Sequence, residues 1–333
     1  MIVKEKTKIS TIITFYYGQI SFLKELIDSI EISVDSLLKS QKQNLIEHNL
    51  IIINDSANPF VEDSLEVFMD DYRSNGISNI VVIHNSTNLG IIGSRLNGLR
   101  CVGGSDIVHI IDQDDKIDRN FYSMAYKIFS KNKEISYIVA GTVISINERS
   151  EQISKLLLPK SLNKIGNNKL LKKLIYGGNF TYSIGNLIFR GTLVDQIITL
   201  LEKFDREIDG PDDAIIQVFL LKSGFKCIFS QDLIFYYRFH DNNYSKEIFG
   251  DFRRRSLKGY NILNQMNLFT DEELKFVKRI DQSIKILRRG FKDWKISDWK
   301  YLISNSHLLI KFFYYKKIYK RPKRFGAKVS HEK

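Results

Sequence analysis

In Ile107-Val108-His109-Ile110-Ile111-Asp112-Gln113-Asp114-Asp115, an apolar run leads directly into clustered carboxylates. Ile- and Val-rich runs with little polar alternation are typical of strands buried on both faces of a parallel sheet. Three comparable runs come earlier, at Ile9–Tyr16, Leu50–Ile53 and Ile80–Ile83. Helical patterns separate the runs, at roughly Ile20–Lys39, Val61–Arg73 and Gly90–Cys101. This alternation predicts an α/β fold with a doubly wound, mostly parallel sheet.

Composition narrows the class of protein. A length of 333 residues allows roughly two domains, or one large α/β domain with an addition. Only 4 Pro and 19 Gly exclude collagen-like and Pro/Gly-rich disordered chains. Two cysteines, Cys101 and Cys227, are too few for a disulfide framework or a four-cysteine zinc site. We find no signal-peptide pattern and no apolar stretch of the ~18–20 residues that span a bilayer, so we expect a cytoplasmic protein.

Polar residues follow all four apolar runs. In doubly wound sheets ligands bind beyond the carboxyl ends of the strands. The segments at those positions are Tyr16–Gln19, Asn54–Ser56, Asn85–Gly90 and Asp112–Asp115. We therefore expect the four strand ends to meet at one crevice.

The carboxylates of Asp112, Asp114 and Asp115 carry the strongest chemical signal. Packed this closely they repel one another unless protons or a cation neutralise them. Oxygen ligands suit Mg²⁺ or Mn²⁺, which commonly also takes phosphate oxygens of a substrate. From the spacing alone, a solvated acidic turn is equally consistent.

Two segments in the first half of the chain suggest a nucleotide site. Asp55 follows the second run, where an acidic residue often binds a ribose or base, although a turn or helix cap explains it equally well. Gly90 and Gly93 would let the backbone approach a ligand, and Arg95 lies within reach of base or phosphate. The glycine spacing differs from the Rossmann fingerprint, and taken alone a plain turn and helix start is the simpler reading.

Two segments in the second half are ambiguous in the same way. The pair Asp212-Asp213 opens a helical pattern, so either helix capping or general base catalysis accounts for it. Arg238 and His240 share one face if the backbone there is extended. A lone histidine is more often structural than functional.

Together these segments resemble family-2 nucleotide-sugar glycosyltransferases of the GT-A fold, in family order across about residues 8–245. The first strand and loop of that family correspond to Ser10–Tyr17. The other elements match in turn: the DDGS element at Asn54-Asp55-Ser56, the NxGxxxARN element at Asn88, Gly90, Ser94 and Arg95, the DxDD element at Asp112, Asp114 and Asp115, the ED element at Asp212-Asp213, and the YRxH…S element at Tyr237, Arg238, His240 and Ser245. The chain departs from the pattern at Asn54, where Asp is usual, and at Leu96, where Asn is usual.

The resemblance implies an inverting transferase with a UDP-sugar as the favoured donor. It implies that the donor-binding residues are Tyr16, Asp55, Asn88, Gly90, Arg95, Asp112 and Arg238. Asp112, Asp114 and His240 would hold Mn²⁺ or Mg²⁺ on the diphosphate, and Asp213 would be the base that deprotonates the acceptor hydroxyl. The implied acceptor is a saccharide or a lipid-linked saccharide, as in cell-surface polysaccharide assembly.

The domain organisation follows from the same comparison. A GT-A domain is expected over residues 1–245, with a nucleotide-binding part at about 8–130 and an acceptor part at about 131–245. Residues 246–333 are expected to form a helical, basic C-terminal region.

Charge is concentrated at the end of the chain. The net charge is 50 − 38 = +12, and the segment from Ser306 onward contributes 9 − 1 = +8 of it, with aromatic residues interleaved. Such a segment suits the anionic inner face of a cell membrane, which predicts peripheral association; the alternative is a packed helix with a solvated end. Nucleic-acid binding is disfavoured because no helix-turn-helix, RNP or zinc signature is present. A non-catalytic sugar-binding module stays as the other alternative, and metal-dependent release of UDP would separate it from a transferase.

Overall fold

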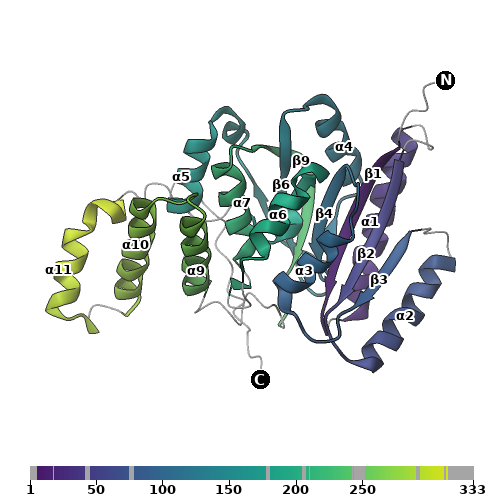
Figure 1. The fold of residues 1–333 in the computed structure, drawn as a ribbon, viewed down its shortest axis with the longest axis horizontal. Coiled ribbons are helices and arrows are strands. Elements are labelled where there is room, and N and C mark those ends of the chain that lie inside the picture. The colour runs from purple at the N-terminus through teal and green to yellow at the C-terminus, as the bar shows by residue number, and fades with distance from the viewer. Residues whose placement is uncertain are drawn as a thin grey trace.

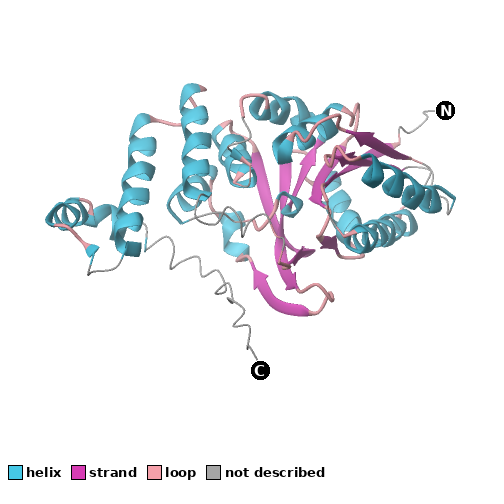
Figure 2. Ribbon diagram, turned by 90° about the horizontal axis from the view of Figure 1, so that it is seen from below, coloured by secondary structure: helices cyan, strands magenta, loops and turns pink. Residues whose placement is uncertain are grey.

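The computed structural model describes residues 6–17, 19–41, 46–74, 79–177, 181–204, 208–209, 211–241, 243, 252–289, 293–310 and 313. The strands form one sheet in the order β3-β2-β1-β4-β8-β6-β9-β5, with β7 paired to β6. Helices flank this curved sheet, and three further helices extend from one side of it (Figure 1, Figure 2).

The first half of the sheet is parallel, as predicted. β1 (Thr7–Phe15) lies between β2 (Ile46–Asn54) and β4 (Ile107–Asp112), and β3 (Ile80–His84) pairs with β2. The connecting helices are α1 (Ile20–Ser40), α2 (Pro59–Ser74) and α3 (Gly90–Arg100), close to the predicted ranges. Ile12, Ile52 and Ile110 are completely buried in neighbouring strands, which is why these runs lack polar alternation.

The second half of the sheet is mixed. β6 (Ile135–Ile146) pairs in parallel with β9 (Lys226–Arg238), whereas β5 (Lys116–Ile117), β7 (Gln152–Leu157) and β8 (Leu187–Arg190) pair antiparallel with their neighbours. The remaining helices of this part are α4 (Phe121–Lys131), α5 (Asn167–Gly177), α6 (Val194–Leu201) and α7 (Asp212–Lys222), with single 3₁₀ turns η2 (Lys160–Lys164), η3 (Ile184–Asn186) and η4 (Gly191–Leu193).

The C-terminal helices pack against α7, where Lys222 also pairs with Glu273 at 2.7 Å. α9 (Phe252–Gln265) contacts α7 and α10 (Asp271–Arg289), and α10 contacts α11 (Ile296–Ser304). Gly259 permits the close approach, since a Cβ there would lie 1.9 Å from Cδ1 of Ile215. The described residues after 250 are thus helical, as predicted, while a domain boundary near 245 stays a prediction. Within the described ranges, every helix is too short or too polar to cross a membrane.

A series of hydrogen bonds links β4 to η3, α4, β1 and β2. His109 contacts the carbonyl oxygen of Gly185 through Nε2 (2.9 Å) and the Tyr122 hydroxyl through Nδ1 (3.1 Å). Tyr122 contacts Thr11 at 2.5 Å, and Thr11 contacts His48 at 2.9 Å. Because Nε2 of His109 must donate to a carbonyl, its Nδ1 accepts from Tyr122 when the ring is neutral. Burial lowers the pKa of both histidines to about 4, so both imidazole rings are neutral at physiological pH.

Candidate active site

The polar strand ends meet at one edge of the sheet, as predicted. The side chain of Asn85, after β3, donates to Asp55 Oδ1, after β2, at 2.8 Å. The side-chain amide of Gln113, after β4, pairs with both backbone groups of Tyr16, after β1: Tyr16 N donates to Oε1 at 2.8 Å and Nε2 donates to the Tyr16 carbonyl at 3.1 Å. The four loops therefore form one connected surface.

Asp55 holds the turn that begins α3. Its Oδ1 accepts from the backbone N–H of Leu89 (2.7 Å) and its Oδ2 from that of Gly90 (2.8 Å). Gly90 has φ +77°, a conformation that favours glycine, and Asn88 Oδ1 also accepts from its N–H. The predicted donor residues Asp55, Asn88 and Gly90 are thus brought together, with the Asp55 carboxylate directed at the loop.

A second carboxylate, missed in the sequence, caps the same helix. Asp209 accepts from the backbone N–H groups of Ile91 and Ile92, at 3.1 Å each. Burial raises the pKa of Asp209 to about 6, even though these hydrogen bonds favour its charged form. The start of α3 is therefore fixed from two sides, by β2 and by the segment before α7.

Arg95 joins the donor side of the site to α7. Its guanidinium is buried and donates to Asp112 Oδ1 at 2.7 Å and to Asp212 Oδ2. Burial disfavours its charge, but the carboxylates of Asp212 and Asp112 outweigh that effect and raise the pKa of Arg95. The first residue of α7 is therefore tied to the last residue of β4.

Asp213 has a different environment from its neighbour. Its Oδ2 accepts from the Thr181 hydroxyl and its Oδ1 from the backbone N–H of Ala214 at 2.7 Å. Ser183, two residues after Thr181, donates to Asp112 Oδ2 at 3.0 Å. The segment 181–183, which the sequence analysis did not single out, thus connects the predicted base to the acidic turn.

The three carboxylates of the acidic turn differ in accessibility. Asp112 and Asp114 keep 31% and 19% of their side-chain surface exposed. Asp114 Oδ2 contacts His240 Nε2 at 2.7 Å and Asn243 Nδ2 at 3.4 Å. Asp115 is buried, and that burial, together with the charges of Asp114 and Asp112, raises its pKa well above the ordinary range. Asp112 and Asp114 are therefore the carboxylates available to a ligand.

The donor set suits a divalent cation shared with phosphates. Among the residues that the structure describes, no three His, Cys, Asp or Glu side chains enclose a ready-made metal cage. Mg²⁺ bound with phosphates usually takes only one or two carboxylates from the protein. Asp114, on the same turn as Asp112, and His240, which contacts Asp114 from the end of β9, fit such a site.

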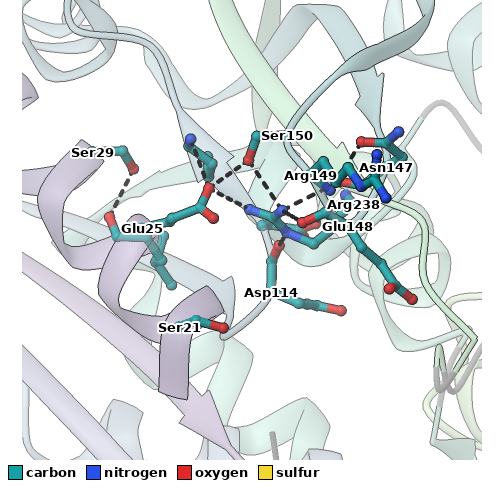
Figure 3. Close-up of polar contacts among 12 residues, drawn as sticks. Ser21, Glu25, Ser29, Asp114, Asn147, Glu148, Arg149, Ser150 and Arg238 are labelled. Atoms are coloured by element: carbon teal, nitrogen blue, oxygen red, sulfur yellow. Dashed lines mark hydrogen bonds and ion pairs between the residues drawn. The ribbon is translucent and has the colours of Figure 1, made fainter. Parts of the chain in front are cut away.

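Arg238 does not face the open edge of the sheet. It is completely buried, and its Nε donates to the Asp114 carbonyl oxygen at 2.8 Å while NH2 donates to Glu25 Oε2 at 2.9 Å (Figure 3). Burial of Glu25 opposes its charge, but hydrogen bonds from Ser150, Lys116 and Arg238 lower its pKa to about 2. The sequence placed Arg238 at the donor; the structure places it behind Asp114, inside the protein.

Two tyrosines stand at the outer rim of the site. Tyr16 and Tyr17 are 50% and 56% exposed, and their rings meet edge to face at 4.8 Å between centroids. Tyr17 has φ +37°, so the chain reverses sharply here. Gln113, whose contact with Tyr16 holds this corner, was not singled out in the sequence. Gly210, which precedes the Asp212-Asp213 pair, and Ser245 of the YRxH…S element lie outside the described residues.

The sequence and the fold are similar to those of known proteins. The family model described as "Glycosyl transferase family 2" matches residues 11–198, more than half of the chain. TarS of S. aureus, residues 1–349 with UDP-GlcNAc, is 15% identical with a TM-score of 0.55, and the match covers 93% of this chain and 81% of that one. GalNAc-T7 with UDP, GalNAc and Mn²⁺ is 14% identical with a TM-score of 0.55, covering 91% and 55%. A longer TarS structure is 16% identical with a TM-score of 0.52, and the match covers 49% of its length. No curated protein is similar enough in sequence to count as a match. At these identities, the solved structures are informative about the fold.

Proposed function

The chain belongs to glycosyl transferase family 2, and from that premise we propose that it moves a sugar from a UDP-sugar to a hydroxyl of a saccharide or lipid-linked saccharide. The observation that carries the proposal is the Arg95 bridge between Asp112 and Asp212. It brings the acidic turn and the start of α7, which lie a hundred residues apart in the sequence, to one edge of the sheet. A transferase needs those two groups together, because one side binds the donor and the other activates the acceptor.

UDP is supported as the nucleotide by the neighbouring folds, since TarS was crystallised with UDP-GlcNAc and GalNAc-T7 with UDP. In this chain, the exposed rings of Tyr16 and Tyr17 lie at the same edge as the acidic turn. The aromatic rings are suited to stacking on the uracil of the nucleotide, and the neighbouring carboxylates, with a bound metal, are suited to its diphosphate. We assign Asp55, Asn88 and Gly90 to shaping the loop that completes this donor site.

We assign Asp112, Asp114 and His240 as the residues that hold Mn²⁺ or Mg²⁺. When bound, such an ion supplies charge stabilisation to the departing diphosphate. Asp213 accepts the proton of the acceptor hydroxyl as that oxygen bonds to the anomeric carbon and the bond to the β-phosphate oxygen breaks. One base and one displacement give inversion, with no covalent sugar intermediate.

Asp212 is disfavoured as the base because one of its carboxylate oxygens is engaged by the Arg95 cation. The hydrogen bond from the Thr181 hydroxyl to Asp213 can rearrange when a substrate arrives. A buried ion pair is far more costly to break.

Metal-dependent nucleotide binding tests the proposal. UDP with Mn²⁺ should raise the melting temperature far more than UDP with EDTA, because a ligand stabilises the state that it binds. Asp114→Ala should remove most of the metal-dependent part of this shift. Asp232→Ala, at an exposed position on β9, serves as the matched control. Equal shifts with Mn²⁺ and with EDTA would reject the metal assignment.

We also propose that the C-terminal region binds an anionic membrane surface. Ile296, Trp299 and Ile303 are 78%, 46% and 70% exposed, and their spacing places them on one face of α11. The basic segment that follows them begins at Ser306, and most of it lies outside the described residues. An apolar helix face next to clustered Lys and Arg is the combination that binds at a lipid interface. A lipid-linked acceptor, as in cell-surface polysaccharide assembly, would then be presented at the inner face of the membrane.

The chain should therefore co-sediment with vesicles containing phosphatidylserine. Each Lys or Arg near such a surface contributes about 1 kcal/mol, and salt weakens the attraction. The double variant Ile296→Ser/Ile303→Ser should bind vesicles less than wild type, while Phe60→Ser, at an exposed position on α2, should bind normally. Undiminished binding by the double variant would exclude α11 from the contact, and salt-independent binding would exclude the basic segment.

A further inference from the structure

Glu25 gathers three donors from three separate parts of the fold. Its Oε2 accepts from Lys116 Nζ at 3.0 Å, from Arg238 NH2 at 2.9 Å and from the Ser150 hydroxyl (Figure 3). Lys116 belongs to β5, Ser150 to the turn between β6 and β7, and Arg238 to the end of β9. One carboxylate of α1 therefore joins the segments that surround the acidic turn.

Arg238 also contacts Asp114, one of the proposed metal ligands. Arg238 Nε donates to the Asp114 carbonyl oxygen at 2.8 Å, and its backbone N–H donates to Asp115 Oδ1 at 3.1 Å. The guanidinium lies 4.3 Å from the centre of the Phe22 ring, and that ring lies 5.5 Å from the ring of His240. The position of the guanidinium thus sets both the main chain of Asp114 and the packing beside His240.

The charge of Glu25 keeps Arg238 in this position. Arg238 is completely buried, and a buried cation requires a charged partner. Its other side-chain contacts are carbonyl oxygens and the Ser150 hydroxyl, so Glu25 is its one ion-pair partner in the described part of the chain. Without that partner, we expect the guanidinium to turn toward the carboxylates of the acidic turn, including that of Asp114, whose main chain it already contacts.

We propose that Glu25 is a positioning residue for the cation and diphosphate site. By holding Arg238 as its counter-ion, it leaves the Asp114 carboxylate open to a divalent cation rather than to the guanidinium. The inference rests on the proposed function in one respect, the assignment of Asp114 and His240 as metal ligands. Glu25 acts through Arg238 and does not itself contact the substrate.

Glu25→Gln tests this, because it removes the charge and keeps an oxygen that accepts hydrogen bonds. With UDP present, the Kd for Mn²⁺ measured by titration calorimetry should rise about 10–100-fold, the usual effect of losing a partner that orients a metal ligand. The Mn²⁺ concentration that half-saturates transfer should rise in parallel, and kcat at saturating Mn²⁺ should return close to the wild-type value. Glu31→Gln, the same substitution on the same helix, is the control and should leave the Kd unchanged.

A double variant separates positioning from a loss of fold. Glu25→Gln/Arg238→Gln removes both charges, so the competing cation is gone and part of the Mn²⁺ affinity lost in Glu25→Gln should return. Glu25→Asp keeps the charge and should give a Kd between wild type and Glu25→Gln. An unchanged Kd in Glu25→Gln, or a loss of kcat that excess Mn²⁺ does not restore, would overturn the inference. If Glu25→Gln fails to fold, a double variant that folds but binds Mn²⁺ no better than Asp114→Ala would overturn it as well. Wild-type protein that binds UDP equally with Mn²⁺ and with EDTA would instead remove the metal assignment on which it rests.

Discussion

Replacement of Asp213 by Asn should lower the rate of sugar transfer by about 10²–10⁴-fold, the usual contribution of a general base. Asn keeps the size of the side chain, and its amide oxygen can still accept from the backbone N–H of Ala214. The variant should fold and should bind UDP with wild-type affinity, because we propose that Asp213 acts on the acceptor and not on the nucleotide. Steady-state release of UDP at saturating donor and acceptor, together with calorimetric UDP binding, measures the two properties separately.

Asp212→Asn is the matched control on the same helix. Since Asp212 pairs with the buried Arg95, its replacement should reduce stability and should affect kcat less than Asp213→Asn does. Near-normal turnover in Asp213→Asn combined with a large loss of kcat in Asp212→Asn would move the base to position 212. A loss of folding in Asp213→Asn would show that the carboxylate serves chiefly to cap α7.

The sequence predicted those parts of the fold that depend on local pattern. The strands β1, β2 and β4 were recognisable because their Ile-rich runs are buried on both faces. The edge strand β3 was recognisable from its Ile and Val residues, although Val81 is 49% exposed. β5 and β8, with 2 and 4 residues, are too short to display a period. Their pairing depends on neighbours that lie far away in the chain.

The site was predictable in its charged residues and less so in their partners. Asp55 and Asp112 stand out because they follow apolar runs, which marks the binding edge of a sheet, and Arg95 stands out because it follows Gly90 and Gly93. Asp209 and Glu25 carry no such mark, because one lies in a loop and the other within the helical pattern of α1. Only the folded chain brings them to the start of α3 and to Arg238.

The end of β9 shows why a correct local rule gave an incomplete picture. Alternation in an extended chain places positions 238 and 240 on the same face. Both do turn toward Asp114, but β9 ends at Arg238, and its guanidinium binds the Asp114 carbonyl oxygen from inside the protein. His240 instead reaches the carboxylate of the same residue. Arg238 is buried and His240 is partly exposed, and side-chain alternation does not predict this difference.

Arg95→Met should lower the free energy of unfolding by about 3–5 kcal/mol, the usual loss when one partner of a buried ion pair is removed. Methionine fills much of the same space but leaves the carboxylates of Asp112 and Asp212 without their shared cation. Urea denaturation should show a lower midpoint with an unchanged slope.

Arg100→Met provides the comparison, since Arg100 lies on the same helix and pairs with Glu202 at 2.8 Å with both side chains about half exposed. An exposed pair contributes about 0–1 kcal/mol, so this variant should be close to wild type. Arg95→Lys should fall between the two, because an ammonium group retains the charge but lacks the planar fork that reaches two carboxylates at once. Equal losses in Arg95→Met and Arg100→Met would mean that the bridge between β4 and α7 does not hold the two halves of the site together. If the bridge does hold the two halves together, only Arg95→Met should lose stability, and it should also bind UDP more weakly.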